Sequence, residues 1–317
     1  MSDARRRVCS SGECADTAYA RPMAGSAEVV RALRNALARA DAELRRAERT
    51  AEIAERHEQQ LLTDPPPLQE FHLRMATTHR QVERQHRAAA AMHATHANRL
   101  RASAEAGGQH HPLPRFMASV AEVANADGAA VTLFGPGMVE TLTVVSDRAT
   151  KAAQDLEFAL GEGPARDTVA GRRPVLAVGI RLRRRWPNYG PAVERLGIHS
   201  IAAVPVGPAR EPLGALTLFG PHHHEDFENL RLLGGTVAAM LVPDEESDGP
   251  EECLSQGPLL AEADHRAVVH QAAGMLSVQI SCTVSDALAL IRARAFADDI
   301  SIESIASDIV EHRLRLA

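Results

Sequence analysis

The chain has 317 residues, which is longer than one ordinary domain and predicts two or three folded units of about 100–150 residues each. A content of 45% hydrophobic and 24% charged residues is typical of globular proteins, and a formal net charge of −6 excludes a uniformly basic nucleic-acid coat but not a local basic patch. Four cysteines without metal-ligand spacing favour a reducing compartment over a disulfide framework. No apolar run reaches the ~20 residues of a membrane helix, so we expect a soluble, cytoplasmic protein with no membrane partner.

The N-terminal third changes in pattern at residue 26. Residues 1–25 lack periodicity and are expected to form a disordered tail. Apolar residues then alternate three and four apart, which predicts a heptad seam on a helix about 55 Å long. The seam comprises Val30, Leu33, Leu37, Ala40, Leu44, Ala47, Ala51, Ala54 and Leu61. Three prolines at 65–67 end this helix, and a second is predicted from Leu68 to Glu105. Residues 26–106 are therefore expected to form a helical hairpin or a broken coiled coil, within or between chains, and to favour a homodimer.

The second of these helices carries a histidine every seventh residue, at His72, His79, His86 and His93. One interpretation is a stripe that becomes charged near pH 6 or binds a metal ion. The other is a set of polar seam positions in a mediocre coiled coil. Successive histidines seven apart lie about 10 Å from each other on one helix, too far to share a metal ion, so we favour the second interpretation.

Residues 115–242 mix helical and strand-like segments. A short amphipathic helix around Phe116–Val123 precedes the strand signals, another helix follows the second of them and runs through Leu156, and a closing helix over about 226–242 ends the domain. Runs typical of strands occur at Gly128–Phe134, Val139–Val145, Pro174–Val178, Ser200–Val206 and Pro212–Phe219. This order predicts an α+β domain with an antiparallel sheet covered by helices.

Two further segments follow. Residues 243–258 contain six acidic residues and three prolines, as expected of an acidic linker. Residues 259–317 are helical in three blocks, with Thr283 or Ser285 as the N-cap of the second and Ser301 as that of the third. Three short helices predict a small bundle that gains stability from dimerisation or from a preceding coiled coil.

Residues 115–242 resemble a GAF sensory domain. The resemblance lies in GEGPARDT (161–168), RRRWPNY (183–189), GIHSIAAVPV (197–206) and LGALTLF (213–219). It implies a pocket on the open face of the sheet for a small-molecule ligand that the sequence does not identify. Some relatives carry a cysteine at the position of Ala165, and this domain contains none, which argues against thiol-dependent sulfoxide reduction and against a thiol-linked chromophore.

Residues 259–317 are similar to an ANTAR domain, an RNA-binding antitermination module. The similarity lies in VVHQAAGMLSVQ (268–279), DALALIRARAFA (286–297) and SIESIASDIVEHRL (301–314). It implies binding of hairpins in nascent transcripts, which requires cations for phosphates and donors for unpaired bases. The residues that we assign to RNA binding are Arg266, His270, Gln271, Gly274, Arg292 and Arg294.

Together these features predict a signal-responsive regulator that acts by transcription antitermination, with the GAF-like domain controlling the C-terminal bundle. The alternative is a signalling and dimerisation scaffold whose acidic tail does not bind RNA. The sequence shows no nucleophile–base motif, phosphate loop or metal cluster, so we expect neither an enzyme nor a cofactor.

Overall fold

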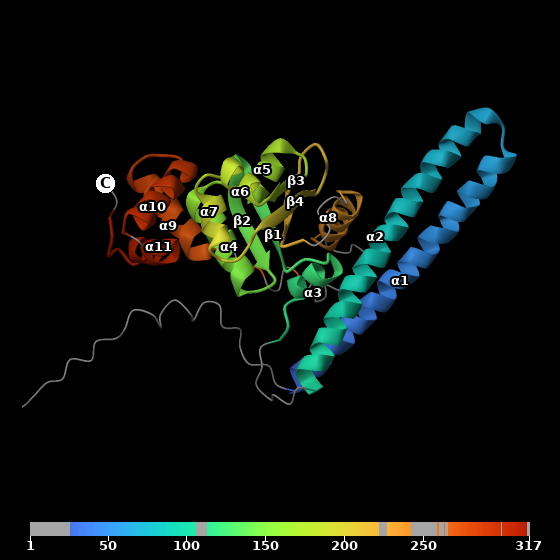
Figure 1. The fold of residues 1–317 in the computed structure, drawn as a ribbon, viewed down its shortest axis with the longest axis horizontal. Coiled ribbons are helices and arrows are strands. Elements are labelled where there is room, and N and C mark those ends of the chain that lie inside the picture. Colours follow the sequence, from blue (N-terminus) through green and yellow to red (C-terminus); the bar gives the residue numbers. More distant parts are fainter. Residues whose placement is uncertain are drawn as a thin grey trace, which may run out of the picture.

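A computed structural model describes residues 26–105, 113–221, 227–241, 259, 263, 266–298 and 300–315. The expected tail at 1–25 and the acidic linker at 243–258 lie outside the described residues. Along the chain, a long helical hairpin comes first, an α+β domain second and a bundle of short helices last (Figure 1). This confirms the predicted α+β class with long N-terminal helices and C-terminal helices.

The hairpin consists of α1 (Ser26–Thr63) and α2 (Pro66–Glu105), which pack against each other within one chain. Proline at the first position of α2 is compatible with a helix start, because its missing N–H would have no intrahelical partner there. The helix therefore begins two residues before the predicted Leu68.

The predicted seam of α1 is correct for three alanines and for Leu33, which packs near Leu100 of α2, and wrong for Val30, Leu37 and Leu44. Ala40, Ala47 and Ala54 are buried against α2, together with Ala36, which was not assigned to the seam. Val30, Leu37 and Leu44 are instead 52%, 44% and 49% exposed. Alanines allow two helix backbones to approach closely, so the alanine side of α1 meets α2, whose own buried positions include alanines.

The histidines at heptad spacing occupy polar positions in this hairpin. Nδ1 of His72 lies 2.9 Å from Nδ1 of His57, and its Nε2 lies 2.9 Å from Asp64. Nδ1 of His86 lies 2.6 Å from a carboxylate oxygen of Glu43. His93 is buried, with its ring 5.0 Å from that of Phe116 on α3. Side chains of the hairpin and of α3 therefore surround these rings, in agreement with the polar-seam interpretation.

The α+β domain is built on one five-stranded antiparallel sheet in the order β2-β1-β5-β4-β3. The strands are β1 (Gly128–Gly135), β2 (Val139–Val145), β3 (Val175–Val178), β4 (Ser200–Val206) and β5 (Gly214–Phe219), each within two residues of its prediction. A 3₁₀ turn, η1 (Pro136–Met138), joins β1 to β2. One sheet face packs on α3 (Phe116–Val123) and α8 (Phe227–Leu241), and α2 lies against these two helices.

The other sheet face is covered by four helices: α4 (Arg148–Leu160), α5 (Pro164–Gly171), α6 (Ile180–Arg185) and α7 (Tyr189–Glu194). Only α4 among these four was predicted. Side chains of β1 alternate between the faces, so Thr132 points toward α4 while Val131 points toward α3. A register shift between Leu133 and Phe134 pairs Phe134 with Glu140, which places the Glu140 carboxylate on the α4 side.

The C-terminal bundle contains α9 (Ala267–Gln279), α10 (Val284–Asp298) and α11 (Ile302–Val310). The hydroxyl of Ser301 accepts a hydrogen bond of 3.1 Å from the backbone N–H of Ser304, which confirms the predicted cap of α11. At α10, the Thr283 hydroxyl accepts from the backbone N–H of Asp286, so Thr283 rather than Ser285 caps the helix. The bundle core is aliphatic and includes Leu276, Ile291 and Ile305.

Within the part of the chain that the structure describes, no single helix combines the length and apolarity needed to cross a membrane. The consecutive helices α9 and α10 meet that test only as a pair, and they are bent by 111° relative to each other.

The buried His93 makes the stability of the hairpin depend on pH. Burial, with smaller effects from Arg39 and His96, lowers the pKa of His93 from 6.5 to about 4. The unfolded chain therefore binds this proton first, and stability falls as the pH drops from 6.5 toward 4. When the pH is lowered from 7 to 4.5, the free energy of unfolding of the wild type, measured with urea, should fall by about 2 kcal/mol relative to that of His93→Leu. His199→Asn, at an exposed histidine, serves as the control. Equal pH dependence of wild type and His93→Leu would contradict this assignment.

Candidate functional site

The C-terminal bundle docks on α4 of the α+β domain through Phe158. This side chain is fully buried and belongs to the same apolar cluster as the core residues of the bundle. Its neighbour Ala159 and Val139 of β2 pack at the edge of that cluster. Figure 1 shows the bundle beside α4, at the end of the domain opposite the hairpin. The α+β domain thus supplies an aromatic residue to the core of the bundle.

Two arginines of the bundle lie over the ring of Phe158. The guanidinium carbon of Arg266 is 4.0 Å from the ring centroid, and that of Arg292 is 4.6 Å from it. A cation over an aromatic face contributes roughly 2 kcal/mol where both groups are shielded from water. We call Arg266, Phe158 and Arg292 the arginine clamp. Both of its arginines are residues that the sequence assigns to RNA binding.

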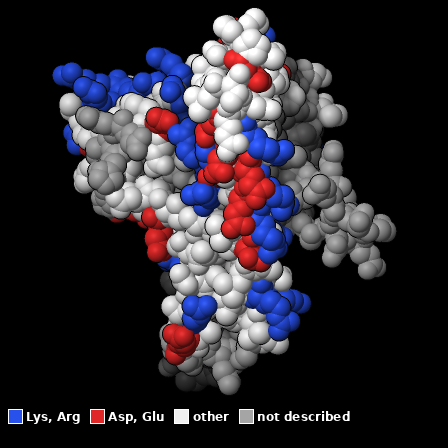
Figure 2. All heavy atoms as spheres, turned by 90° about the vertical axis from the view of Figure 1, so that its right-hand side faces the viewer, with Lys and Arg blue, Asp and Glu red and all other residues white. Residues whose placement is uncertain are grey.

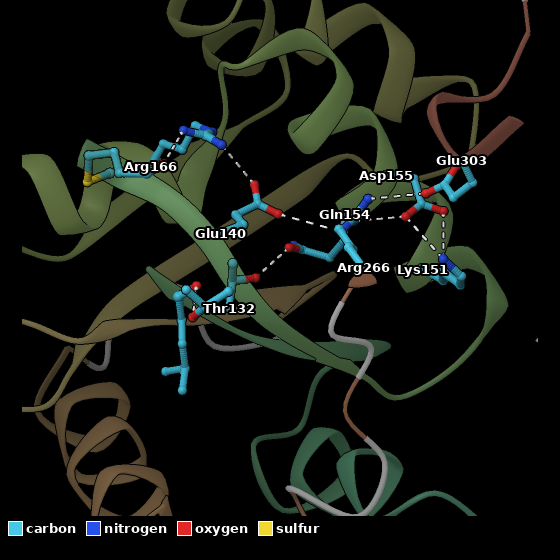
Figure 3. Close-up of polar contacts among 11 residues, drawn as sticks. Thr132, Glu140, Lys151, Gln154, Asp155, Arg166, Arg266 and Glu303 are labelled. Atoms are coloured by element: carbon cyan, nitrogen blue, oxygen red, sulfur yellow. Dashed lines mark hydrogen bonds and ion pairs between the residues drawn. The ribbon is translucent and has the colours of Figure 1, made fainter. Parts of the chain in front are cut away.

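Arg266 connects the bundle to the α+β domain by charge as well. Its side chain is only 4% exposed and its guanidinium group lies 2.9 Å from Asp155 of α4, 3.6 Å from Glu303 of α11 and 3.8 Å from Glu140 of β2 (Figure 3). The residue precedes α9 with a φ of 43°, in the left-handed region that costs a side-chain-bearing residue about 1–2 kcal/mol. The chain therefore maintains a strained conformation where this guanidinium group enters the interface.

Arg166 extends this network of charged side chains into the α+β domain. Its guanidinium group lies 3.1 Å from Glu140 and donates to the carbonyl oxygen of Met138 over 3.0 Å (Figure 3). The backbone N–H of Arg166 donates to the Glu157 carboxylate over 2.9 Å. A continuous series of polar contacts thus runs from Glu157 through Arg166 and Glu140 to Arg266.

At the other two interface residues, Arg292 and His270, burial disfavours the positively charged form of the side chain. The pKa of Arg292 is lowered to about 10, mainly by burial and also by the guanidinium groups of Arg166 and Arg266, against the attraction of Glu140. Burial also lowers the pKa of His270, so its ring is neutral at pH 7. Nε of Arg292 and Nε2 of His270 are inaccessible to water and have no hydrogen-bond partner among the described residues.

The remaining residues assigned to RNA binding lie on the accessible surface. Gln271 and Arg294 are exposed, and Arg294 pairs with Asp298 on its own helix at 2.6 Å. A Cβ added at Gly274 would meet nothing within 4 Å, so close packing of helices does not require a glycine there. The six assigned residues therefore divide into three at the interface and three at the surface.

Sequence reasoning missed the residues that contact these arginines. Phe158, Asp155 and Glu303 carry no motif, and Asp155 lies 111 positions before its partner Arg266. It also missed Phe296 on α10, whose side chain is 81% exposed beside the surface residues of the bundle. Phe296 is the only aromatic residue of α10, and this isolated aromatic residue is a signal that the sequence offers.

A polar interior lies between the sheet and α4, α5 and α7. Thr132 donates to the side-chain oxygen of Gln154 over 2.7 Å. Several other polar atoms there are buried without a hydrogen-bond partner among the described residues; they belong to Thr143, Gln154, Glu157, Thr168, Tyr189 and Thr217. Buried polar groups are usually paired, so this concentration identifies the interior as a candidate ligand site. The sequence predicts a pocket on an open sheet face, whereas helices cover both faces of this sheet. Two surface hollows lie elsewhere, one near Asp127 and Asp147 and one between α2 and α8.

Glu157 is the most perturbed acid of this interior. Its pKa is raised to about 8, mainly by burial and also by the nearby Glu140, against the hydrogen bond from the backbone of Arg166. Burial also raises the pKa of the Tyr189 hydroxyl, and the nearby Glu157 adds to the effect. The interior is therefore able to accept or release a proton near neutral pH.

Comparison with known proteins leaves the family open. No protein-family model matches the chain, and no curated protein sequence is significantly similar to it.

The raised pKa of Glu157 gives a testable pH dependence. The unfolded carboxyl ionises near 4.5 and the folded one near 8, so the wild type loses stability as the pH rises between these values. Glu157→Gln keeps the acceptor for the Arg166 N–H and does not ionise. Between pH 5 and pH 8, the free energy of unfolding of Glu157→Gln, measured with urea, should rise by about 3 kcal/mol relative to that of the wild type. Glu228→Gln, at an exposed glutamate, should show no such rise. Parallel pH profiles for wild type and Glu157→Gln would show that this carboxyl is not perturbed.

Proposed function

We propose that this protein is a signal-responsive RNA-binding regulator that acts by transcription antitermination and has no enzymatic activity. Its C-terminal bundle binds hairpins in nascent RNA, and its α+β domain, which resembles a GAF domain, controls that binding through a small-molecule ligand. The observation that carries this proposal is the position of Arg266, His270 and Arg292, which lie against the α+β domain.

The arginine clamp supports a closed form of the regulator. Phosphates and the face of Phe158 compete for the same guanidinium groups, so docking and RNA binding exclude each other at Arg266 and Arg292. Docking also places three carboxylates, from Glu140, Asp155 and Glu303, around Arg266, where a phosphate would be repelled. Undocking would turn both arginines toward solvent and leave two of these carboxylates on the α+β domain.

The polar contacts between the interior and the clamp supply a route for the signal. A ligand in the interior that pairs with Glu157 or Arg166 competes with the bond from Arg166 to Glu140. A displaced Glu140 in turn withdraws one of the acids that surround Arg266. The docked bundle is thus less stable when the interior is occupied, and ligand binding shifts the population toward the open form.

In the open form the bundle presents both charge and an aromatic surface. Residues 257–317 contain eight acids and five bases, so attraction to RNA depends on the local placement of arginines and not on net charge. Arg292 and Arg294 lie on α10 together with the exposed ring of Phe296. Arginines that contact phosphates, next to an aromatic ring that stacks on an unpaired loop base, form a suitable combination for an RNA hairpin.

Substitutions in the α+β domain that weaken the arginine clamp test this proposal. Phe158→Ala and Asp155→Ala weaken docking without altering any residue of the bundle, so we expect each to raise the affinity for hairpin RNA about tenfold, which corresponds to about 1.4 kcal/mol of lost docking energy. Fluorescence polarisation with a hairpin RNA and a scrambled RNA at two salt concentrations measures this effect. Adding Arg292→Ala to Phe158→Ala should abolish the gain and reduce the salt dependence.

Glu228→Ala, which removes the same charge far from the bundle, is the matched control for Asp155→Ala and should leave the affinity unchanged. Equal RNA affinity of wild type, Phe158→Ala and Asp155→Ala would contradict the closed form. If neither the wild type nor the released variants bind hairpin RNA at low salt, the RNA-binding proposal is wrong. The excess of acids in the tail would then favour the alternative, a non-enzymatic signalling and dimerisation scaffold.

A further inference from the structure

The outer side of α1 carries an apolar stripe that has no partner in the described part of the chain. Val30, Leu37 and Leu44 recur at intervals of seven, and each is about half exposed. Ala51, one heptad further on, is partly buried and extends the stripe. At 1.5 Å per residue these positions cover about 32 Å of helix, which is long enough for a helix–helix contact. An exposed row of apolar residues at heptad spacing is typical of a contact with a second helix.

The stripe lies next to the seam that α1 already uses. Leu37 directly follows the buried Ala36, and one residue corresponds to a rotation of about 100° around the helix. α1 can therefore pack its alanine side on α2 and its leucine side on another helix at the same time, as helices in bundles do. A partner helix can therefore pack on the leucine side of α1 without any rearrangement of the hairpin.

The charges between the apolar positions determine which partner fits. Arg34, Asp41 and Glu48 alternate with Val30, Leu37, Leu44 and Ala51 along the same side of the helix. In an antiparallel pair of two identical helices with a two-fold axis near Asp41, Leu37 faces Leu44 and Arg34 faces Glu48. Each of these contacts then occurs twice, which is the self-complementarity that a two-fold symmetric interface requires.

We propose that α1 pairs with α1 of a second copy of this chain in this antiparallel register. A parallel, in-register pair would place Arg34 on Arg34 and Glu48 on Glu48, which is repulsive at both positions. In the antiparallel pair only Asp41 approaches its own copy, and Arg45 on the same helix already pairs with that carboxylate. The sequence alone favours a homodimer. The stripe on α1 further specifies that α1 is the helix that pairs, which of its faces is used, and that the two helices run antiparallel.

The surrounding surface agrees with a second copy as the partner. Seen from the hairpin side, acidic and basic side chains are intermixed on this face, and neither sign dominates (Figure 2). A nucleic acid would require a basic surface, whereas a mixed surface is complementary to itself. This inference goes beyond the proposed function and does not depend on RNA binding.

Sedimentation equilibrium of the full chain at micromolar concentrations tests the pairing. The wild type should have twice the monomer mass of 34.1 kDa. The double variant Leu37→Asp/Leu44→Asp should be monomeric, or dimerise at least tenfold more weakly, because it places four carboxylates in the interface. Leu73→Asp, at a leucine of α2 that is 53% exposed and outside the stripe, should dimerise like the wild type. Helix content from circular dichroism verifies that each variant is folded.

A charge exchange tests the antiparallel register. Arg34→Glu alone and Glu48→Arg alone should each weaken the dimer about tenfold, because each places two like charges together, and the double variant should restore the affinity. A monomeric wild type would overturn the proposal. It would equally be overturned by a Leu37→Asp/Leu44→Asp variant that dimerises like the wild type, or by a double charge variant that is no tighter than the single ones.

Discussion

A guanidinium group that leaves water keeps its charge, so its burial is tolerated only where carboxylates or an aromatic face replace the lost hydration. The interface between the C-terminal bundle and α4 meets this requirement for Arg266 with three acids and for both clamp arginines with the ring of Phe158. The free-energy cost of removing these charges from water nearly cancels the free energy gained from their interactions with the partners. The contact is therefore specific in geometry but modest in net free energy, as a reversible docking must be.

The position of Glu140 explains how the docking is connected to the sheet. A register shift in the β1–β2 pair turns its carboxylate to the α4 side, where it meets Arg166 and Arg266. Without this irregularity the acid would point toward the apolar layer of α3 and α8. This one bulge thus connects the bundle to the polar interior. Buried polar atoms there lack hydrogen-bond partners among the residues that the structure describes, which makes the interior the candidate ligand site. The proposed regulation requires both features and nothing from the distant hairpin.

Local patterns predicted the elements but not the contacts between them. The strands and the cap at Ser301 follow from hydrophobic alternation and from side-chain capping, which depend on a few neighbouring residues. The short helices α5, α6 and α7 contain too few turns to establish a period and were missed. In α1, alanines and leucines both fit the heptad, and only the shape of α2 selects the alanine side. Arg266 and Asp155 are 111 residues apart, and no local signal indicates that they meet.

The central claim is that RNA and α4 compete for the same arginines. Amide hydrogen exchange of the full chain, with and without a saturating hairpin RNA, tests this competition directly at α4. The account predicts that RNA binding accelerates exchange in residues 151–160, which lose their cover, while α9 and α10 become better protected. Protection of α9 and α10 by RNA without any change in residues 151–160 would show that the bundle binds RNA while still docked, and would contradict the claim.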